Sequence, residues 1–120
     1  YHVEVGKIMT AELLGLGLLD KADVQKQTEK NPAYKKYFMH GTSHHLGLDT
    51  HDYGLIDKPI TANMVFTVEP GIYIPEEGFG IRLEDDVVVQ ASGEPLNLMK
   101  NIPIEAEEIE DLMNREQWIV

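Results

Sequence analysis

Apolar positions at helical spacing dominate the first third of the chain. Val5 and Met9 fall on one side of a helical pattern, and Asp20 is placed to cap a helix that follows it. Asn31-Pro32 marks a boundary before one more helical turn. The pattern predicts three helical segments, over residues 1–19, 20–27 and 33–37.

The middle of the chain changes to a strand pattern. Runs of β-branched and aromatic residues are separated by Pro70-Gly71, by a loop over 76–80 and by Ser92-Gly93, as is typical of short strands joined by turns. Strands are predicted over residues 64–69, 72–74, 81–90 and 96–98, and an amphipathic helix over 104–114. Helices, then strands, then a helix predict an α+β fold with a mainly antiparallel sheet.

Length and charge narrow the possible classes of protein and of binding partner. The 120 residues suffice for one domain, and the net charge of −11 disfavours nucleic acid and anionic membrane surfaces as partners. The absence of cysteine excludes disulfides and thiolate metal sites. The chain shows neither a signal-peptide pattern nor an apolar run of the ~20 residues that span a bilayer. We therefore expect a cytoplasmic protein without a membrane partner.

Histidines gather just before the first strand. Four of the five fall between His40 and His51. A single histidine is more often a surface residue than a ligand, but this concentration favours metal binding or proton transfer. The zincin motif is absent, because Gly41 stands where that motif needs a glutamate.

Two carboxylates complete the candidate chemistry. Glu69 ends an apolar strand, and strand alternation places Arg82 and Glu84 on one face of the next strand region. The structural alternatives are a Glu69 that emerges into solvent and an exposed Arg82–Glu84 pair of little energetic value. One histidine with two glutamates suits a divalent metal, favouring Mn²⁺ with Co²⁺ or Zn²⁺ as alternatives. The residues alone indicate metal-assisted hydrolysis and leave the substrate open.

Three segments carry a family resemblance. Residues 40–52 (HGTSHHLGLDTHD), 66–73 (FTVEPGIY) and 80–86 (GIRLEDD) resemble the C-terminal motifs of aminopeptidase P and prolidase, which are pita-bread metallopeptidases. The resemblance implies that residues 1–120 form the C-terminal part of the catalytic domain. Its fold would be the C-terminal half of the pita-bread (creatinase/aminopeptidase) fold, with helices on one face of the sheet.

The resemblance also implies the metal ligands. His44 resembles the histidine ligand of one metal, Glu69 a carboxylate ligand beside the nucleophilic water, and Glu84 the carboxylate that bridges two metals. The family's other two ligands are aspartates from its N-terminal half. We expect Tyr1 to mark a cut inside a longer protein, so this chain would hold at most one ion, and that one weakly.

The same resemblance assigns catalytic and substrate roles. His40 and His51 resemble the histidines that line the substrate site and handle protons. Arg82 and Tyr73 resemble supporting residues, Arg82 in catalysis and Tyr73 at the substrate. Glu69 would take part in the proton transfer. His45 falls where the family varies and receives no role.

The implied activity is that of a dinuclear-metal Xaa-Pro aminopeptidase. Its substrate would be a peptide with proline at the second position, and its cofactors two divalent ions, with manganese favoured. The fragment alone is expected to be inactive and to associate with a second copy, because one half of the fold leaves an edge and an apolar face uncovered. The alternatives are a prolidase specific for Xaa-Pro dipeptides and a pita-bread binding module without catalysis.

Overall fold

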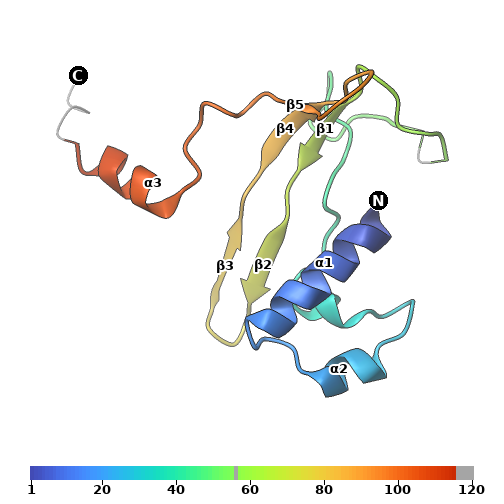
Figure 1. The fold of residues 1–120 in the computed structure, drawn as a ribbon, viewed down its shortest axis with the longest axis vertical. Helices are drawn as coiled ribbons and strands as arrows, with labels where there is room; N and C mark the ends of the chain where they lie inside the picture. Colours follow the sequence, from blue (N-terminus) through green and yellow to red (C-terminus); the bar gives the residue numbers. More distant parts are fainter. Residues whose placement is uncertain (56, 116–120) are drawn as a thin grey trace.

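The computed structural model describes residues 1–55 and 57–115 (Figure 1). Four helical elements and five strands follow one another along this part of the chain. The helices are α1 (His2–Gly15), α2 (Lys21–Lys26), the 3₁₀ helix η1 (Ala33–Lys36) and α3 (Ala106–Met113). The strands are β1 (Val65–Val68), β2 (Gly71–Ile74), β3 (Phe79–Arg82), β4 (Asp85–Val88) and β5 (Leu96–Asn97). The predicted α+β class with antiparallel strands is confirmed.

The strands form two small sheets, with orders β1-β4-β5 and β2-β3. Figure 1 shows that β1 leads into β2 and β3 into β4, so the two sheets are parts of one long hairpin. Both ladders share one register, since Val68 pairs with Asp85 and Gly71 with Arg82. The amide of Leu83 donates to the carbonyl of Pro70 at 3.2 Å and keeps this register through the junction.

Several boundaries differ from the sequence-based expectation. The strand predicted over 81–90 is interrupted at residues 83–84, and β3 begins at Phe79, inside the expected loop. The turn needs only residues 75–78, where Gly78 adopts a positive φ of 73° that glycine accepts without steric cost. The junction breaks because Pro70, opposite Leu83, has no amide to donate.

The helices follow the predicted pattern with shorter bounds. α1 ends at Gly15 and not at residue 19, and Gly17 turns the chain with a φ of 73°. Asp20 caps α2 as expected: its carboxylate accepts from the amide of Asp23, and the Asp23 carboxylate accepts from the amide of Asp20. Such a reciprocal pair satisfies two amides that a helix start leaves open.

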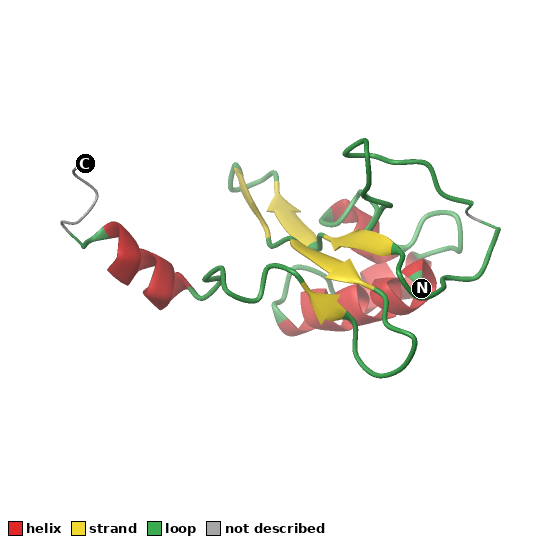
Figure 2. Cartoon of the chain, turned by 90° about the horizontal axis from the view of Figure 1, so that it is seen from above, coloured by secondary structure: helices red, strands yellow, loops and turns green. Residues whose placement is uncertain are grey.

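The core lies where α1 and η1 meet one face of the β2–β3 hairpin. Leu13, Leu19 and Tyr37 form a buried cluster, and Ile72 and Ile74 of β2 pack against it. α3 stands away from both sheets at the end of the chain's last connection (Figure 2). Within the described residues, no helix is both long and apolar enough to cross a membrane. α1 and η1 therefore lie on one face of the β2–β3 hairpin, and the other face carries polar side chains.

Candidate metal centre

The junction of the two sheets brings two carboxylates face to face. The shared register places Glu69, one residue after β1, opposite Glu84, one residue before β4. Like charges directly opposite each other destabilise an antiparallel pair. A cation between the two carboxylates would remove that repulsion.

His44 joins the two glutamates from a segment that runs beside β1. Backbone hydrogen bonds fix this segment, from the Thr67 amide to the His44 carbonyl at 3.0 Å and from the Glu69 amide to the Thr42 carbonyl at 2.8 Å. One ligand atom each from His44, Glu69 and Glu84 lies within 4.8 Å of the other two. The sequence-based prediction that these three side chains converge is confirmed, and their roles as metal ligands stay a prediction.

The imidazole of His44 lies between two hydrogen-bond acceptors. Its Nδ1 is 2.9 Å from the carbonyl of His45, and its Nε2 is 3.2 Å from Oε1 of Glu69. A neutral imidazole carries one proton and cannot donate to both acceptors. With the proton on Nδ1, the lone pair of Nε2 is directed to the carboxylates, which suits a bound metal ion. A metal-ligating histidine typically donates its second nitrogen to a carbonyl in this way.

Glu69 is held at both carboxylate oxygens. The residue is only 8% exposed. Oε2 accepts from Nη1 of Arg82 at 3.2 Å, and Oε1 accepts from the hydroxyl of Thr67 at 3.1 Å. Glu84, by contrast, is exposed. The buried glutamate therefore has a fixed orientation, whereas the exposed one can adjust to what binds.

Arg82, Tyr73 and His40 form a hydrogen-bonded chain across the same face. Nε of Arg82 donates to the hydroxyl of Tyr73 at 2.9 Å, and this bond raises the pKa of Arg82. His40 Nδ1 lies 2.6 Å from the carbonyl of Gly41, so this nitrogen carries the proton. The Tyr73 hydroxyl then donates to His40 Nε2 at 2.9 Å. The prediction that Arg82 and Glu84 share a strand face is confirmed, since Arg82 reaches the site through Glu69.

Two glycines make room for Tyr73. A Cβ at Gly80 would lie 2.4 Å from Cδ1 of the tyrosine ring, and one at Gly71 would lie 2.9 Å from its hydroxyl. Both glycines occupy the polar face of the hairpin, where atoms of the Tyr73 ring lie close to each of them. The sequence alone indicates only turn or strand positions for both glycines.

His51 approaches from the loop that follows the histidine-rich segment. Its exposed ring lies 4.3 Å from the ring of His44, centroid to centroid. Asp52 stabilises this loop through two hydrogen bonds. Its carboxylate accepts from the amides of Tyr53 at 2.7 Å and Leu48 at 2.8 Å. These bonds lower the pKa of Asp52, with the Tyr53 amide as the largest cause.

Two residues without a predicted role, Thr67 and His45, lie at the site. Thr67 is 2% exposed and contacts both His44 and Glu69. Its position two residues before Glu69 on the same strand face was the available signal. His45 packs its ring on Phe66 with centroids 4.3 Å apart and pairs with it in a β-bridge. His45 is therefore a structural anchor of the segment that presents His44.

The donor set fits a divalent metal. Two carboxylates and one imidazole nitrogen supply hard and borderline ligands, and the second nitrogen of the imidazole is already hydrogen-bonded. The two facing carboxylates of Glu69 and Glu84 favour a cation between them. Manganese, cobalt and zinc all accept such a set, so the geometry supports a metal without selecting one.

Comparison with known proteins agrees with this chemistry. The metallopeptidase family M24 matches residues 6–91. The Xaa-Pro aminopeptidase of Escherichia coli is 44% identical over 122 residues, which cover 92% of this chain and 27% of that protein. Xaa-Pro aminopeptidase 3 of Homo sapiens is 38% identical, covering 89% of this chain and 24% of that protein. The chain thus spans about a quarter of the length of these relatives.

Two solved structures share the fold. A putative aminopeptidase P from Bacillus anthracis superposes with a TM-score of 0.78 at 40% identity, covering 93% of this chain and 25% of that one. The aminopeptidase PepP of Pseudomonas aeruginosa gives 0.79 at 37% identity, covering 93% and 28%. The fold expected from the resemblance, part of the pita-bread architecture, is confirmed. The sequence match and the shared fold together show that this chain belongs to the metallopeptidase family M24.

Proposed function

We propose that residues 1–120 are the C-terminal part of the catalytic domain of a dinuclear-metal Xaa-Pro aminopeptidase. The observation that carries this proposal is the convergence of His44, Glu69 and Glu84, with ligand atoms within 4.8 Å of one another. The relatives named Xaa-Pro aminopeptidase support the reaction and its substrate. That substrate is a peptide with proline at the second position.

The metal chemistry follows from the donor set. His44, Glu69 and Glu84 would hold a divalent ion, and we favour manganese over cobalt and zinc because two of the three donors are hard carboxylate oxygens. When bound, such ions polarise a peptide carbonyl and provide a nucleophile from water at neutral pH. Three ligands leave a second ion without its own donors, so we expect at most one weakly held ion in residues 1–120. The second ion needs the two aspartates that the family resemblance places upstream.

The other polar side chains would orient the substrate and move protons. Glu69, fixed by Arg82, would accept a proton beside the ion. His40 and His51 stand on either side of His44 along the chain; the His40 ring contacts that of Tyr73 and the His51 ring that of His44. We assign them to the substrate and to proton transfer to the leaving amine. Tyr73 would support His40 at the substrate through its hydroxyl.

A comparison of two chains tests the function. The 120-residue chain and the full-length protein that contains it are assayed with Mn²⁺ on an Xaa-Pro tripeptide and on an Xaa-Pro dipeptide. We expect activity of the full-length protein on the tripeptide and little or none from the short chain. Equal kcat/KM values for the two chains would contradict the need for a second set of ligands. Cleavage of the dipeptide alone would make the protein a prolidase.

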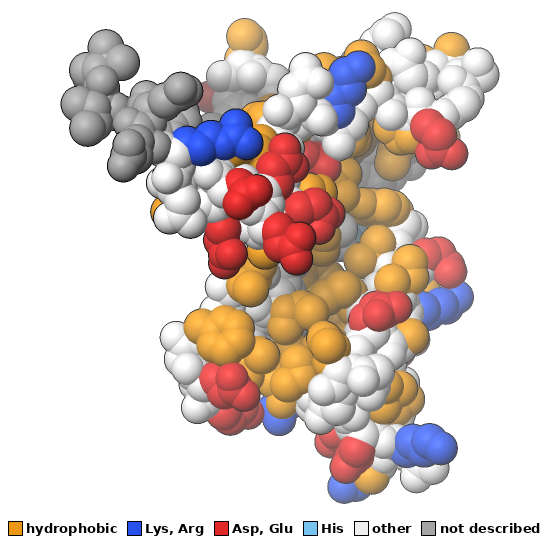
Figure 3. Space-filling model, turned by 60° about the vertical axis from the view of Figure 1, so that its left-hand side comes forward, with side chains coloured by type: hydrophobic (Ala, Val, Ile, Leu, Met, Phe, Trp, Pro, Cys, Tyr) orange, Lys and Arg blue, Asp and Glu red, His pale blue; other side chains and the backbone are white. Residues whose placement is uncertain are grey.

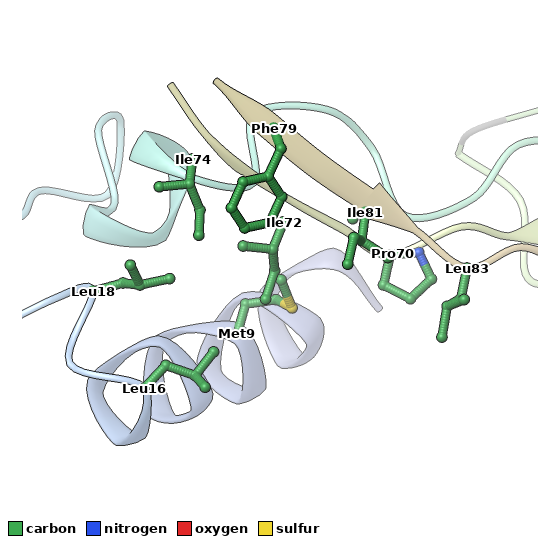
Figure 4. A pocket seen from close by; sticks show the side chains of 10 residues that line it. Met9, Leu16, Leu18, Pro70, Ile72, Ile74, Phe79, Ile81 and Leu83 are labelled. Atoms are coloured by element: carbon green, nitrogen blue, oxygen red, sulfur yellow. The ribbon is translucent and has the colours of Figure 1, made fainter. Parts of the chain in front are cut away.

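We also propose that the 120-residue chain associates with a second copy through its apolar face. A groove of about 490 Å³ lies between α1 and the hairpin (Figure 4). Figure 3 shows that hydrophobic side chains dominate this face below a group of acidic ones. The groove is lined by Met9, Leu16, Leu18, Pro70, Gly71, Ile72, Ile74, Phe79, Ile81 and Leu83. Exposed apolar surface of this kind favours a partner over water.

A cytoplasmic location stays a prediction.

A further inference from the structure

A single buried hydroxyl connects two of the three converging side chains. Thr67 is 2% exposed and is among the largest fully buried side chains of the described chain. Its Oγ1 accepts from the backbone amide of His44 at 3.0 Å. The same oxygen donates to Oε1 of Glu69 at 3.1 Å. Oε1 is also the atom that lies 3.2 Å from Nε2 of His44.

The direction of these two bonds is fixed. A backbone amide can only donate, so the Thr67 oxygen must act as acceptor toward His44. The one hydroxyl proton is then available for the Glu69 carboxylate. Because Arg82 can only donate to the other carboxylate oxygen, both oxygens of Glu69 accept from a donor that has a defined direction. The carboxylate plane is therefore set from two sides.

The strand geometry makes this arrangement possible. Thr67 and Glu69 are two residues apart on β1 and its continuation, so their side chains share one face. The neighbouring segment pairs with β1, which places the amide of His44 directly over Thr67. Threonine is stiff at χ1, and its hydroxyl stays where both contacts can form. One side chain thus sets the spacing between a histidine on one segment and a glutamate on another.

We propose that Thr67 is a positioning residue for the metal site, a role that rests on the proposed function of this site. Its hydroxyl occupies one lone pair of Glu69 Oε1 and leaves the rest of the carboxylate for an ion that the site would hold. It also anchors the backbone that carries the His44 imidazole. Without the hydroxyl, the Glu69 carboxylate turns about its last bond. Glu69 Oε1 and His44 Nε2 then no longer point to the same position.

The test compares variants of the full-length protein in metal binding. Thr67→Val keeps the shape and removes the hydroxyl, while Thr67→Ser keeps the hydroxyl. Calorimetric titration with Mn²⁺ gives the dissociation constant, and the visible spectrum with Co²⁺ reports the ligand geometry. We expect Thr67→Val to weaken Mn²⁺ binding by about 10–100-fold, as the loss of a hydrogen-bonded support of a ligand typically does. Thr67→Ser is expected to bind close to the unsubstituted protein and to keep its Co²⁺ spectrum.

Thr42→Val is the matched control. Thr42 is also buried, at 3% exposed. Its carbonyl accepts from the Glu69 amide, a backbone bond that the substitution keeps, and in the described chain its hydroxyl forms no hydrogen bond with His44, Glu69 or Glu84. We expect this control to change the free energy of unfolding and not the metal affinity. If Thr67→Val fails to fold by circular dichroism, Thr67→Ala, which removes the hydroxyl together with the methyl group, takes its place.

The outcomes separate two failures. Unchanged Mn²⁺ affinity in Thr67→Val, with a loss of stability like that of Thr42→Val, would overturn the positioning role and leave the proposed function intact. A Thr67→Ser variant as weak as Thr67→Val would overturn it too, because the hydroxyl would then not be the cause. Absence of Mn²⁺ binding by the unsubstituted full-length protein would count against the proposed function itself.

Discussion

The two faces of the β2–β3 hairpin are built from the same eight strand residues. They differ in how many of their side chains find a partner within the described chain. On the polar face, Tyr73 and Arg82 bond to each other and onward to His40 and Glu69. On the apolar face, α1 covers only part of the surface. On that face Phe79 is 50% exposed, Ile81 62% and Leu83, the residue after β3, 49%.

This difference shows which contacts of the site come from neighbouring segments of the chain. Polar partners within the hairpin and one adjacent segment bond Tyr73, Arg82 and Glu69 on the polar face. The apolar side chains differ, because they are removed from water only when another element packs against them. The convergence of His44, Glu69 and Glu84 thus arises within residues 40–84, whereas the apolar groove stays open in the described chain.

The largest expected effect comes from a charge on the polar face. Glu84→Gln keeps the shape of the side chain and removes the charge that faces Glu69. Loss of a supporting residue costs metal affinity about 10–100-fold, so loss of a direct ligand should cost at least about 100-fold. Mn²⁺ calorimetry on the full-length protein measures it. Glu77→Gln, in the exposed turn, is the control, and equal affinities in the two variants would remove Glu84 from the site.

A methyl group on the polar face has the next largest effect. Gly80→Ala places a Cβ 2.4 Å from the Tyr73 ring and 3.2 Å from the Ile72 carbonyl, so the ring must move and its bonds to His40 and Arg82 weaken. We expect the free energy of unfolding to fall by about 1–3 kcal/mol, the usual cost of overpacking. Urea denaturation measures it. Gly15→Ala, where nothing lies within 4 Å, is the control, and an equal response would contradict the close fit.

A charge on the apolar face should act on association and leave metal binding unchanged. Ile81→Lys places an ammonium group in the groove, where a second copy would bury it. We expect the dissociation constant of the dimer to rise at least about tenfold, since an unpaired buried charge costs more than ~1.4 kcal/mol. Sedimentation velocity measures it, with Ser92→Lys as a control of equal charge on an exposed loop. A monomer before any substitution would refute the proposed association.

The sequence predicted what strand alternation and motif spacing control. Alternation alone placed Arg82 and Glu84 on one face with Ile81 and Leu83 on the other, and the structure confirms it. The order of the elements was right as well. The convergence of His44 with the two glutamates rested on the family resemblance, because no periodicity relates a loop residue to a strand.

The missed features depend on pairing between segments. The break at Leu83 follows from its partner Pro70 on the other arm, and nothing in residues 81–90 signals it. The role of Gly80 depends on the ring of Tyr73 across the ladder. Thr67 acquires its contact with His44 only because an irregular segment pairs with β1. Each requires knowing the register, which a single sequence does not contain.

The smallest expected effect is an acid-dependent opening at the rim of the polar face. The Tyr53 and Leu48 amides lower the pKa of Asp52 in the folded protein. A carboxylate with a lowered pKa stabilises the fold above its unfolded-state pKa, and that contribution disappears as the pH falls through the folded-state value. We therefore expect the loop that carries His51 to loosen only on the acid side.

Amide chemical shifts and hydrogen exchange of Leu48 and Tyr53, followed by NMR during an acid titration, report the change. Asp52→Asn should remove the transition and leave the loop loosened at neutral pH. The amide of Ile81, on the apolar face, should not respond, because the groove beside it is lined by uncharged side chains. A simultaneous response of Ile81 would mean that acid unfolds the whole hairpin and that the two faces are not independent.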